Sequence, residues 1–427
     1  MFGERQRPER IRAEQSRALR RSLRREVLPF SEFYRRRAES SDHGRRVDGI
    51  DDLPRLALTD LEEIADPAQL VLRPDPVTIA RYGPRLMAVR AMWARLWGRQ
   101  DTFGHSHIDP VYKPVHWVMA GSVPIGCTAA DLDRLAELGR RALEGAGLRP
   151  SDVLVTVTPP RPTIGFTQLS SGARRAGISA LHLGALPSTG ELRHLRPTVL
   201  AGRPSDLLSV ARAASDAGLP LEGVHTLLAI EDRLDHVTRA DLERYVPGAV
   251  VVAMWAPPGV RAHWVECRGG DGLHTWPAAE VVEVVDATTR RPVTPGDTGE
   301  IVWTAVGWRG TCLIRLRTHV SGRMEEAACP TCGRTSARLQ LLPPPPPLHQ
   351  LLDERTEVRA WQAELRTVDG LDELLVYLSL RDDKALSAVV DAVDRRVNAT
   401  QYVLLSPDAM ADRLASASGN QLIDLRV

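Results

Sequence analysis

Residues 128–158, TAADLDRLAELGRRALEGAGLRPSDVLVTVT, decide the fold class of this 427-residue chain. Leucines at helical spacing follow Thr128 and Asp131, a pair that is typical of a helix N-terminus because its oxygens accept free amide protons. Gly145 indicates where that helix ends. The run DVLVTVT at 152–158 is apolar and rich in β-branched residues, like a strand buried in a parallel sheet.

The same alternation of helix and strand continues to about residue 255. The predicted strands are 178–183, 198–201, 224–230 and 249–255, and the predicted helices are 167–176, 205–217 and 238–245. Strands that alternate with helices at this spacing form a parallel sheet covered by helices. The sequence therefore predicts an α/β fold whose large N-terminal domain, 46–342, contains a mostly parallel sheet.

Beyond residue 260 the pattern changes to short strands separated by turns, at 281–286, 300–305 and 313–317. We expect a β-rich subdomain over about 260–342. Five consecutive prolines at 343–347 favour an extended, semi-rigid linker. The remaining residues, 348–427, mix strands and helices and predict a small C-terminal α+β domain.

Residues 1–45 are rich in arginine and carry leucines at helical spacing, so we expect amphipathic helices that pack on the main body. An arm that binds nucleic acid is the alternative. Acidic residues are interleaved with the arginines, and the whole chain has a net charge of only +1. We therefore expect no nucleic-acid partner.

Composition also bears on localisation. No apolar run approaches the roughly 20 residues of a membrane helix, and the first residues, MFGERQRPER, lack the apolar core of a secretory signal. We expect a cytoplasmic protein without a membrane partner. The chain has five cysteines, an odd number that favours metal binding or free thiols over a disulfide framework.

Two pairs of residues have the spacing of zinc ligands. Cys329 and Cys332 are separated by two residues in CPTCG, and Cys267 and His274 bracket a glycine-rich loop, RGGDGL. Zinc binds four such ligands in a tetrahedron, and four protein ligands leave no open position for catalysis. The sequence predicts one structural zinc ion, with free buried thiols as the alternative. Cys127 and Cys312 are predicted core residues.

Short motifs occur in a fixed order over roughly residues 50–427. They are GIDDLPRLALTDLEEI at 49–64, LRPTVLAGRPSDLL at 195–208, EC followed by GLH within 266–274, GEIV at 299–302, RLRT at 315–318 and CPTCGR at 329–334. Together they resemble the phenylacetate–CoA ligase branch of the adenylate-forming superfamily. In that family the matching cysteine and histidine positions form a zinc site, in agreement with the spacing argument.

The resemblance implies an activity and a fold. Family members join ATP to a carboxylic acid, release pyrophosphate, and then transfer the acyl group from AMP to the thiol of coenzyme A. Their large N-terminal domain is followed by a small C-terminal lid that rotates between the two half-reactions. If this chain is an enzyme, the resemblance implies an AMP-forming acid–thiol or CoA ligase.

The nucleotide motifs of the family are degraded in this chain. The phosphate-binding motif SSGTTGkP is matched by MAGSVPIG at 119–126, in which Gly121 and Ser122 are the remaining candidates. Trp255 lies near the position of the aromatic residue that stacks on adenine, but the family's adjacent glycine and its magnesium-binding glutamate are missing. The resemblance leaves Trp255 as a cofactor-binding candidate.

The motifs that follow depart from the family in the same way. Arg315 and Arg317 belong to the RLRT motif and are cofactor-binding candidates, but the ribose-binding aspartate that the family places after this motif is absent. The proline run at 343–347 replaces the family's hinge. Asn420 occupies the expected position of a lysine near the C-terminus, and asparagine carries no positive charge. The use of ATP, Mg²⁺ and CoA is therefore doubtful.

Three functional hypotheses remain open. The first is a catalytically degenerate relative that acts as a scaffold, a partner of another protein or a binder of a small aryl or acyl acid. The second is an active AMP-forming ligase with a rewired nucleotide site. The third is an unrelated activity that uses His105, His107 or His182. A homo-oligomer is compatible with all three.

Overall fold

The computed structural model contains two units, Met1–Leu341 and Leu342–Val427, with hydrophobic cores of their own. The residues that the structure describes are 5–39, 47–61, 63–64, 66–83, 85–120, 123–183, 187, 189–218, 221–286, 289–342, 348–352, 355–368, 371–394, 401–416 and 422–424. The proline run at 343–347 lies outside them.

Five parallel strands form one half of the large sheet in the first unit. They are β3 (Val153–Thr156), β4 (Ser179–His182), β5 (Val199–Gly202), β6 (Thr226–Ile230) and β7 (Val250–Trp255). Their order in the sheet is β7-β6-β5-β3-β4, and each neighbouring pair is parallel. The strands predicted from their β-branched composition are thus present and parallel.

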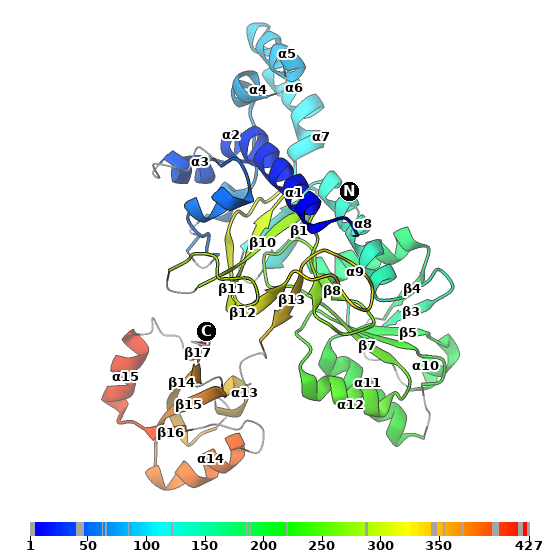
Figure 1. Ribbon diagram of the computed structural model, residues 1–427, viewed down its shortest axis with the longest axis vertical. Coiled ribbons are helices and arrows are strands. Elements are labelled where there is room, and N and C mark those ends of the chain that lie inside the picture. The colour runs from blue at the N-terminus through cyan, green and yellow to red at the C-terminus, as the bar shows by residue number, and fades with distance from the viewer. Residues whose placement is uncertain are drawn as a thin grey trace. The chain divides into compact units, whose positions relative to one another are not determined.

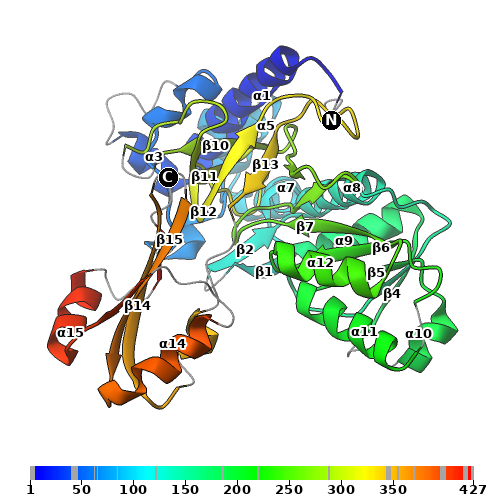
Figure 2. The ribbon, with the colours of Figure 1, turned by 60° about the horizontal axis from the view of Figure 1, so that its bottom comes forward.

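Helices cover both faces of these strands (Figure 2). They are α8 (Ala129–Gly145), α9 (Ile164–Ala176), α10 (Thr189–Leu195), α11 (Pro204–Asp216) and α12 (His236–Tyr245). Helix α8 begins at Thr128, whose side chain and that of Asp131 form the reciprocal bonds of a capping box. Residues from α8 and α9 share one core cluster with Leu154 and Leu228, whereas residues from α11 and α12 share another with Val155 and Leu227. Neighbouring residues of one strand therefore point to opposite helical layers.

Antiparallel strands extend the same sheet beyond β7. They are β8 (Trp264–Glu266), β9 (Leu273–His274), β10 (Glu280–Val285), β11 (Thr298–Ala305), β12 (Leu316–Glu325) and β13 (Arg338–Leu341). Strand β8 pairs antiparallel with β7, so the β-rich part and the parallel part share one eleven-stranded sheet among the described residues. The sequence did not indicate that they share one sheet.

One predicted strand is placed differently. Residues 313–317 were predicted as a strand, but β12 begins only at Leu316. Arg315 has a φ angle of 49°, a left-handed conformation outside the β region. Cys312 is fully buried, as predicted for a core residue, but it lies outside the strands.

The first helices of the chain pack on the antiparallel half of the sheet. They are α1 (Pro8–Ser22), the π-helical turn η1 (Leu23–Val27), α2 (Leu28–Phe30) and α3 (Glu32–Glu39). Leu19, Leu23 and Val27 are fully buried in the same core cluster as residues of the sheet. The arginines between these positions face solvent, as the amphipathic pattern predicted.

A group of helices projects from the first unit (Figure 1). After the 3₁₀ turns η2 (Ile50–Arg55) and η3 (Pro67–Leu70) come α4 (Pro76–Tyr82), α5 (Arg85–Leu96), α6 (Gln100–Phe103), η4 (Gly104–Ile108) and α7 (Asp109–Tyr112). Helix α5 is apolar on two sides: Ala91 is buried, whereas Leu96 and Trp97, the residue that follows the helix, are 76% and 67% exposed. A two-stranded hairpin, β1 (His116–Ala120) and β2 (Val123–Cys127), precedes α8.

The second unit is a small α+β structure. Its elements are α13 (Leu348–Leu352), β14 (Val358–Val368), β15 (Leu371–Leu380), η5 (Asp383–Ala385), α14 (Leu386–Asp394), β16 (Gln401–Leu404), α15 (Pro407–Ser416) and β17 (Leu422–Asp424). The strands form a sheet in the order β16-β15-β14-β17 around a core that includes Trp361. Within the described part of the chain, every helix is too short or too polar to cross a membrane.

Candidate functional site

Four side chains that could bind a metal ion meet in the antiparallel half of the sheet. The sulfur atoms of Cys267 and Cys329 are 3.7 Å apart, and the Cys332 sulfur is 3.4 Å from Nε2 of His274. All four ligand atoms lie within 4.8 Å of one another. Two sulfurs on one tetrahedral zinc ion are about 3.8 Å apart, since each Zn–S bond is about 2.3 Å long. The donor atoms therefore have the types and separations that zinc requires.

Strand pairing explains how residues from two distant segments meet. Cys267 directly follows β8 and His274 ends β9, whereas both remaining cysteines lie between β12 and β13. Strand β13 pairs with β9 and places Arg338 opposite His274. Gly333 closes the cysteine turn with a φ angle of 69°, and its amide donates to the Cys329 carbonyl at 2.9 Å.

The surroundings of the cluster favour the metal-binding forms of two ligands. Burial lowers the pKa of His274 to about 4, which keeps the imidazole neutral. Burial raises the pKa of the Cys329 thiol, but hydrogen bonds from the amides of Cys332 and Thr331 outweigh this effect and lower the pKa. Nδ1 of His274 is buried without a hydrogen-bond partner among the described residues.

A second polar site lies at the carboxyl ends of β3, β5 and β6, the edge where open α/β sheets bind ligands. It is a cavity of about 90 Å³, lined by residues that include Thr158, Arg161, Phe166, Arg203 and Glu231. Ligand pockets usually measure roughly 300–1,000 Å³, so this cavity is small for a nucleotide.

Hydrogen bonds hold most polar groups of this edge in place. Asp206 accepts from the Thr158 hydroxyl at 2.8 Å and from the Arg203 guanidinium at 2.8 Å. Glu231 accepts from the Thr163 hydroxyl at 2.8 Å and has a φ angle of 70°. Burial raises the pKa of the Glu231 carboxyl. A non-glycine residue in this conformation stores strain of a kind that clusters at binding sites.

His263 lies beside Glu231 beneath the first turn of α9. A Cβ atom added at Gly165 would lie 2.6 Å from Nδ1 of His263 and 2.6 Å from Oε1 of Glu231. This Nδ1 is buried without a partner in the described part of the chain, and burial lowers the pKa of His263 to about 4. Only glycine fits at position 165, because a side chain would collide with the imidazole ring.

The segment that the resemblance matches to the ATP-phosphate loop lies between two paired strands. Ala120 of β1 pairs with Val123 of β2, so only Gly121 and Ser122 join the two strands. Both of these cofactor-binding candidates lie outside the described residues. Family members place a longer glycine- and threonine-rich loop at this point.

Trp255, the adenine-stacking candidate, is the last residue of β7. It pairs with Trp264 of β8, and its side chain is only 8% exposed. The Arg233 guanidinium lies 5.5 Å from its ring centroid. One face of the indole is therefore already covered by a cation of the protein itself.

Arg315 is engaged within the core. Its guanidinium donates to both carboxylate oxygens of Glu283 at 3.1 Å and to the Leu56 carbonyl at 2.7 Å. Arg315 is 1% exposed and Glu283 is 7% exposed. Such a bidentate pair fixes the guanidinium in one orientation.

Arg317 and its neighbours form a second set of ion pairs. Arg317 donates to Glu300 at 3.0 Å and lies 3.5 Å from a carboxylate oxygen of Asp60. Nε2 of His319 is 3.0 Å from the same Asp60 oxygen. The cation of Arg317 is thus neutralised by two carboxylates, and a histidine occupies the region where the family has a ribose-binding aspartate.

The histidines of the third hypothesis lie on two elements, η4 and β4. His105 pairs with Asp109 at 3.0 Å, and the His107 ring stacks on Phe103, both on the projecting helices. His182 ends β4, where Nδ1 is 2.5 Å from the Thr156 hydroxyl and burial lowers the pKa. Asn420 lies outside the described residues.

The structure thus assembles the predicted metal ligands, but the sequence missed Glu231 and His263. Neither residue belongs to one of the family motifs. The only sequence signal is their placement, since Glu231 directly follows β6 and His263 directly precedes β8. Polar residues at the ends of buried strands are the positions to inspect first.

Comparisons with known proteins identify related sequences and folds. No protein-family model matches the chain. A phenylacetate-coenzyme A ligase from Thermus thermophilus is 27% identical over 326 residues, which cover 72% of this chain and 64% of that ligase. The chain therefore spans slightly less than two thirds of its relative's length.

Solved structures of 2-hydroxyisobutyryl-CoA ligase share the fold. In its thioesterification state with 2-HIB-AMP and CoA, that ligase has a TM-score of 0.64 and 17% identity, covering 99% of this chain and 91% of the ligase. An open conformation of it gives a TM-score of 0.62 and 18% identity, covering 93% and 88%. At this identity the similarity concerns the fold alone. The sequence relative and the shared fold both support the resemblance of this chain to the phenylacetate–CoA ligase branch of the adenylate-forming superfamily.

Proposed function

We propose that this family member does not carry out standard ATP-dependent acyl adenylation and has kept a scaffold or acid-binding role. The observation that carries the proposal is the pairing of Ala120 with Val123. A phosphate cradle needs several backbone amides that point at the ligand. A connection of two residues offers few amides, because alternate amides of the flanking strands bond across the hairpin and the Gly126 amide donates to the Thr311 hydroxyl.

The arginines of the next motif support the same proposal. Arg315 is committed to the buried Glu283, and Arg317 to Glu300 and Asp60. A guanidinium that is already paired with a carboxylate could bind a phosphate only by breaking that ion pair. The carboxylate would then remain buried without its cation, which is unfavourable. Each preorganised electrostatic group that an active site lacks costs on the order of 3 kcal/mol of transition-state stabilisation.

The cavity at the carboxyl ends of β3, β5 and β6 is the proposed site for a small aryl or acyl acid. Arg161 lines this cavity, where its charge attracts the Glu231 carboxyl and would also attract the carboxylate of a bound acid. Phe166 supplies an aromatic wall. The volume of about 90 Å³ suits the acid better than an acyl-adenylate.

Trapping experiments test both parts of this proposal. The full chain is incubated with ATP, Mg²⁺, hydroxylamine and one acid at a time, from phenylacetate to 2-hydroxyisobutyrate, beside an active ligase. We expect no hydroxamate above background. Calorimetry without ATP should detect an acid whose affinity falls in Arg161→Gln but not in Arg174→Gln, an arginine outside this cavity. Acid-dependent hydroxamate formation would refute the proposal.

The second candidate function is an active AMP-forming ligase with a rewired nucleotide site and CoA as acceptor. The kinship with a phenylacetate-coenzyme A ligase favours it. An enzyme of this kind would form hydroxamate, and Arg317→Gln or a change in the 119–126 segment would weaken its binding of Mg-ATP. The trapping experiment therefore separates the two candidates.

We also propose that Cys267, His274, Cys329 and Cys332 hold one structural zinc ion. The distances between their ligand atoms support this assignment, and no fifth donor is needed. The zinc would join the loop after β8 to the turn between β12 and β13. Its role would be to stabilise the fold, because four protein ligands leave no position for a substrate.

A further inference from the structure

A larger cavity lies in the first unit, away from the parallel strands. It measures about 890 Å³, within the usual range of ligand pockets. Its walls come from α1 and η1, the junction of α4 and α5, the end of α7, helix α8 and the segments around residues 278 and 306–309. No residue of the family motifs quoted above lines it.

The lining carries a large excess of positive charge. The residues that contribute guanidinium groups are Arg21, Arg25, Arg85, Arg134 and Arg309. The carboxylate among the described lining residues is that of Glu26, which already pairs with Arg309 at 3.2 Å. Four guanidinium charges therefore face the cavity without a carboxylate from its lining.

Arg25 and Arg134 lie at different depths in the wall of the cavity. Arg25 lies on the exposed surface of η1, one helical turn after Arg21. Arg134 lies deeper on α8, where it donates to the Val306 carbonyl at 2.8 Å and covers the Trp308 ring. Burial lowers the pKa of Arg134, and repulsion from Arg309 adds to this effect, whereas Asp131 and Glu26 oppose it. An anion bound in the cavity would offset the repulsion between the guanidinium groups of Arg134 and Arg309.

Aromatic rings line the same cavity. Phe30 and Tyr112 pack edge to face with ring centroids 5.5 Å apart, and the Arg309 guanidinium lies 6.0 Å from the Tyr112 centroid. Tyr82, at the end of α4, is 42% exposed. Rings and guanidinium planes together form a surface on which a planar ring can stack.

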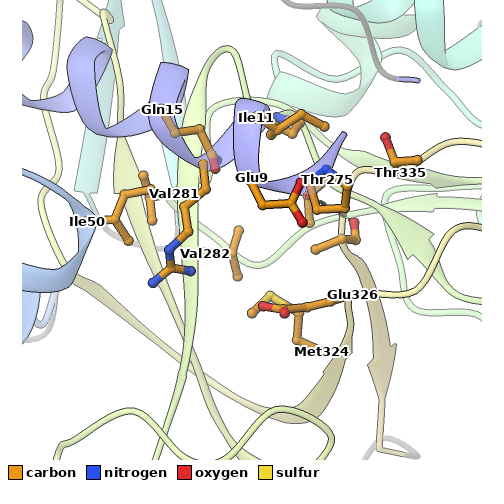
Figure 3. Close-up of a pocket in the computed structure, with 14 residues that line it drawn as sticks. Glu9, Ile11, Gln15, Ile50, Thr275, Val281, Val282, Met324, Glu326 and Thr335 are labelled. Carbon is orange, nitrogen blue, oxygen red and sulfur yellow. Dashed lines mark hydrogen bonds between the residues drawn. The ribbon is translucent and has the colours of Figure 1, made fainter. Parts of the chain in front are cut away.

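A neighbouring cavity shows that the positive lining is not a general effect of the arginine-rich composition. That cavity measures about 290 Å³ and lies between α1 and the strands β10 and β12 (Figure 3). Its lining includes Glu9 and Glu326, and its Arg12 is paired with Asp51. Its lining is thus close to neutral or acidic and unsuited to an anion.

We propose that the 890 Å³ cavity binds a phosphorylated small molecule of nucleotide size that carries a planar ring. The guanidinium groups bind the phosphates by charge-assisted hydrogen bonds, and the aromatic side chains of the cavity stack on the planar ring. The arginine-rich N-terminal helices thereby acquire a role that the proposed function does not explain. The site is independent of acyl adenylation.

Calorimetry on the full chain without magnesium tests this proposal with ADP, inorganic pyrophosphate and adenosine. ADP should bind most tightly, pyrophosphate more weakly and adenosine least, and ADP affinity should fall as salt is raised. The variant Arg21→Gln with Arg25→Gln should weaken ADP binding about tenfold, since two charge-assisted contacts are lost. The matched control, Arg17→Gln with Arg20→Gln on the same helix, should leave the affinity unchanged within about twofold.

Several results would overturn the proposal. One is ADP binding that is absent, or that is equally strong in the wild-type chain and in Arg21→Gln with Arg25→Gln. Another is a short oligonucleotide that binds much more tightly than ADP, because it would assign the arginines to a nucleic-acid surface. Arg85→Gln provides a second variant at the exposed junction of α4 and α5, and thermal unfolding verifies that all variants are folded.

Discussion

Glu280 is a buried carboxyl group surrounded by tryptophans. Oε1 accepts from the Trp264 indole at 2.8 Å and from the Trp276 amide at 2.6 Å, and Oε2 accepts from the Trp303 indole at 2.6 Å. Burial raises the pKa of this carboxyl to about 7 although these bonds oppose the shift. Glu280 therefore links strands β8, β10 and β11 through one titratable group.

Stability should consequently depend on the protonation of Glu280. Between about pH 4.5, the ordinary value, and about pH 7 the folded chain holds a proton that the unfolded chain has lost. The free energy of unfolding should thus fall as pH rises through this window, by on the order of 1 kcal/mol per pH unit, and level off above it. Urea unfolding at pH 5.0 and 7.5 measures this change.

Glu280→Gln removes the titration and places an amide N–H₂ against an indole N–H. We expect this variant to be less stable by about 1–3 kcal/mol, since a buried donor loses its acceptor. Its unfolding should also lack the wild-type component of pH dependence. Glu243→Gln, at an exposed position, serves as control. Identical pH dependence in Glu280→Gln and the wild type would contradict this account.

Arg315 should behave as a core residue. Arg315→Met leaves the buried Glu283 carboxylate without its cation, so we expect a loss of about 3–5 kcal/mol in the free energy of unfolding. Combining it with Glu283→Leu should recover a large part of that loss, as urea unfolding would reveal. If Arg315 served only a ligand, the single substitution would hardly change stability.

At the residue scale, sequence predicts chemistry that is local. The metal ligands were predicted because each pair lies within eight positions of the chain and few residue types bind zinc. The partners of Glu280 and Arg315 were not predictable, because Trp303 and Glu283 come from other strands. A motif identifies an arginine as a candidate binding residue, but it does not reveal whether the guanidinium contacts a ligand or a buried carboxylate.

At the scale of elements, the zinc cluster should stabilise the short strands around it. Strand β9 has only two residues and β13 only four, so pairing alone holds them weakly. Cys332→Ser, or chelation of the metal, should increase hydrogen exchange in β9, β13 and the turn between β12 and β13. The parallel strands should remain protected.

Metal content provides the control for this prediction. We expect about one zinc ion per wild-type chain, by elemental analysis, and much less in Cys332→Ser. Cys312→Ser, which alters a buried thiol outside the cluster, should keep its zinc. Wild-type protein purified without bound metal, yet fully protected in β9 and β13, would contradict the proposed role.

The elements that sequence predicts well are those with strong local patterns. Helix α8 and strands β3 to β7 follow from leucine spacing, a capping box and β-branched runs. Strands β8 and β9 are not predictable because two or three residues are too few to show an alternation of apolar and polar side chains. Since these strands join the two halves of the sheet, the continuity of the eleven-stranded sheet is not predictable either. Helix α5 was missed because its apolar residues surround the helix rather than forming one stripe.

At the scale of the whole molecule, the two units have separate hydrophobic cores. A chain that ends at residue 342 should therefore stay folded, keep its zinc and unfold within about 5 °C of the main transition of the full chain. Differential scanning calorimetry of both proteins measures this. An insoluble or metal-free fragment would mean that the first unit depends on residues 343–427 for its stability.

The central claim concerns chemistry rather than binding, because the arginine-lined cavity is itself expected to bind nucleotides. The most direct measurement is the exchange of labelled pyrophosphate into ATP, with Mg²⁺ and a panel of carboxylic acids, on the full chain. Our account predicts exchange no faster than in the absence of acid, for every acid tested. Exchange that depends on one acid, and that Arg317→Gln abolishes, would show that the nucleotide site has been rewired and not lost.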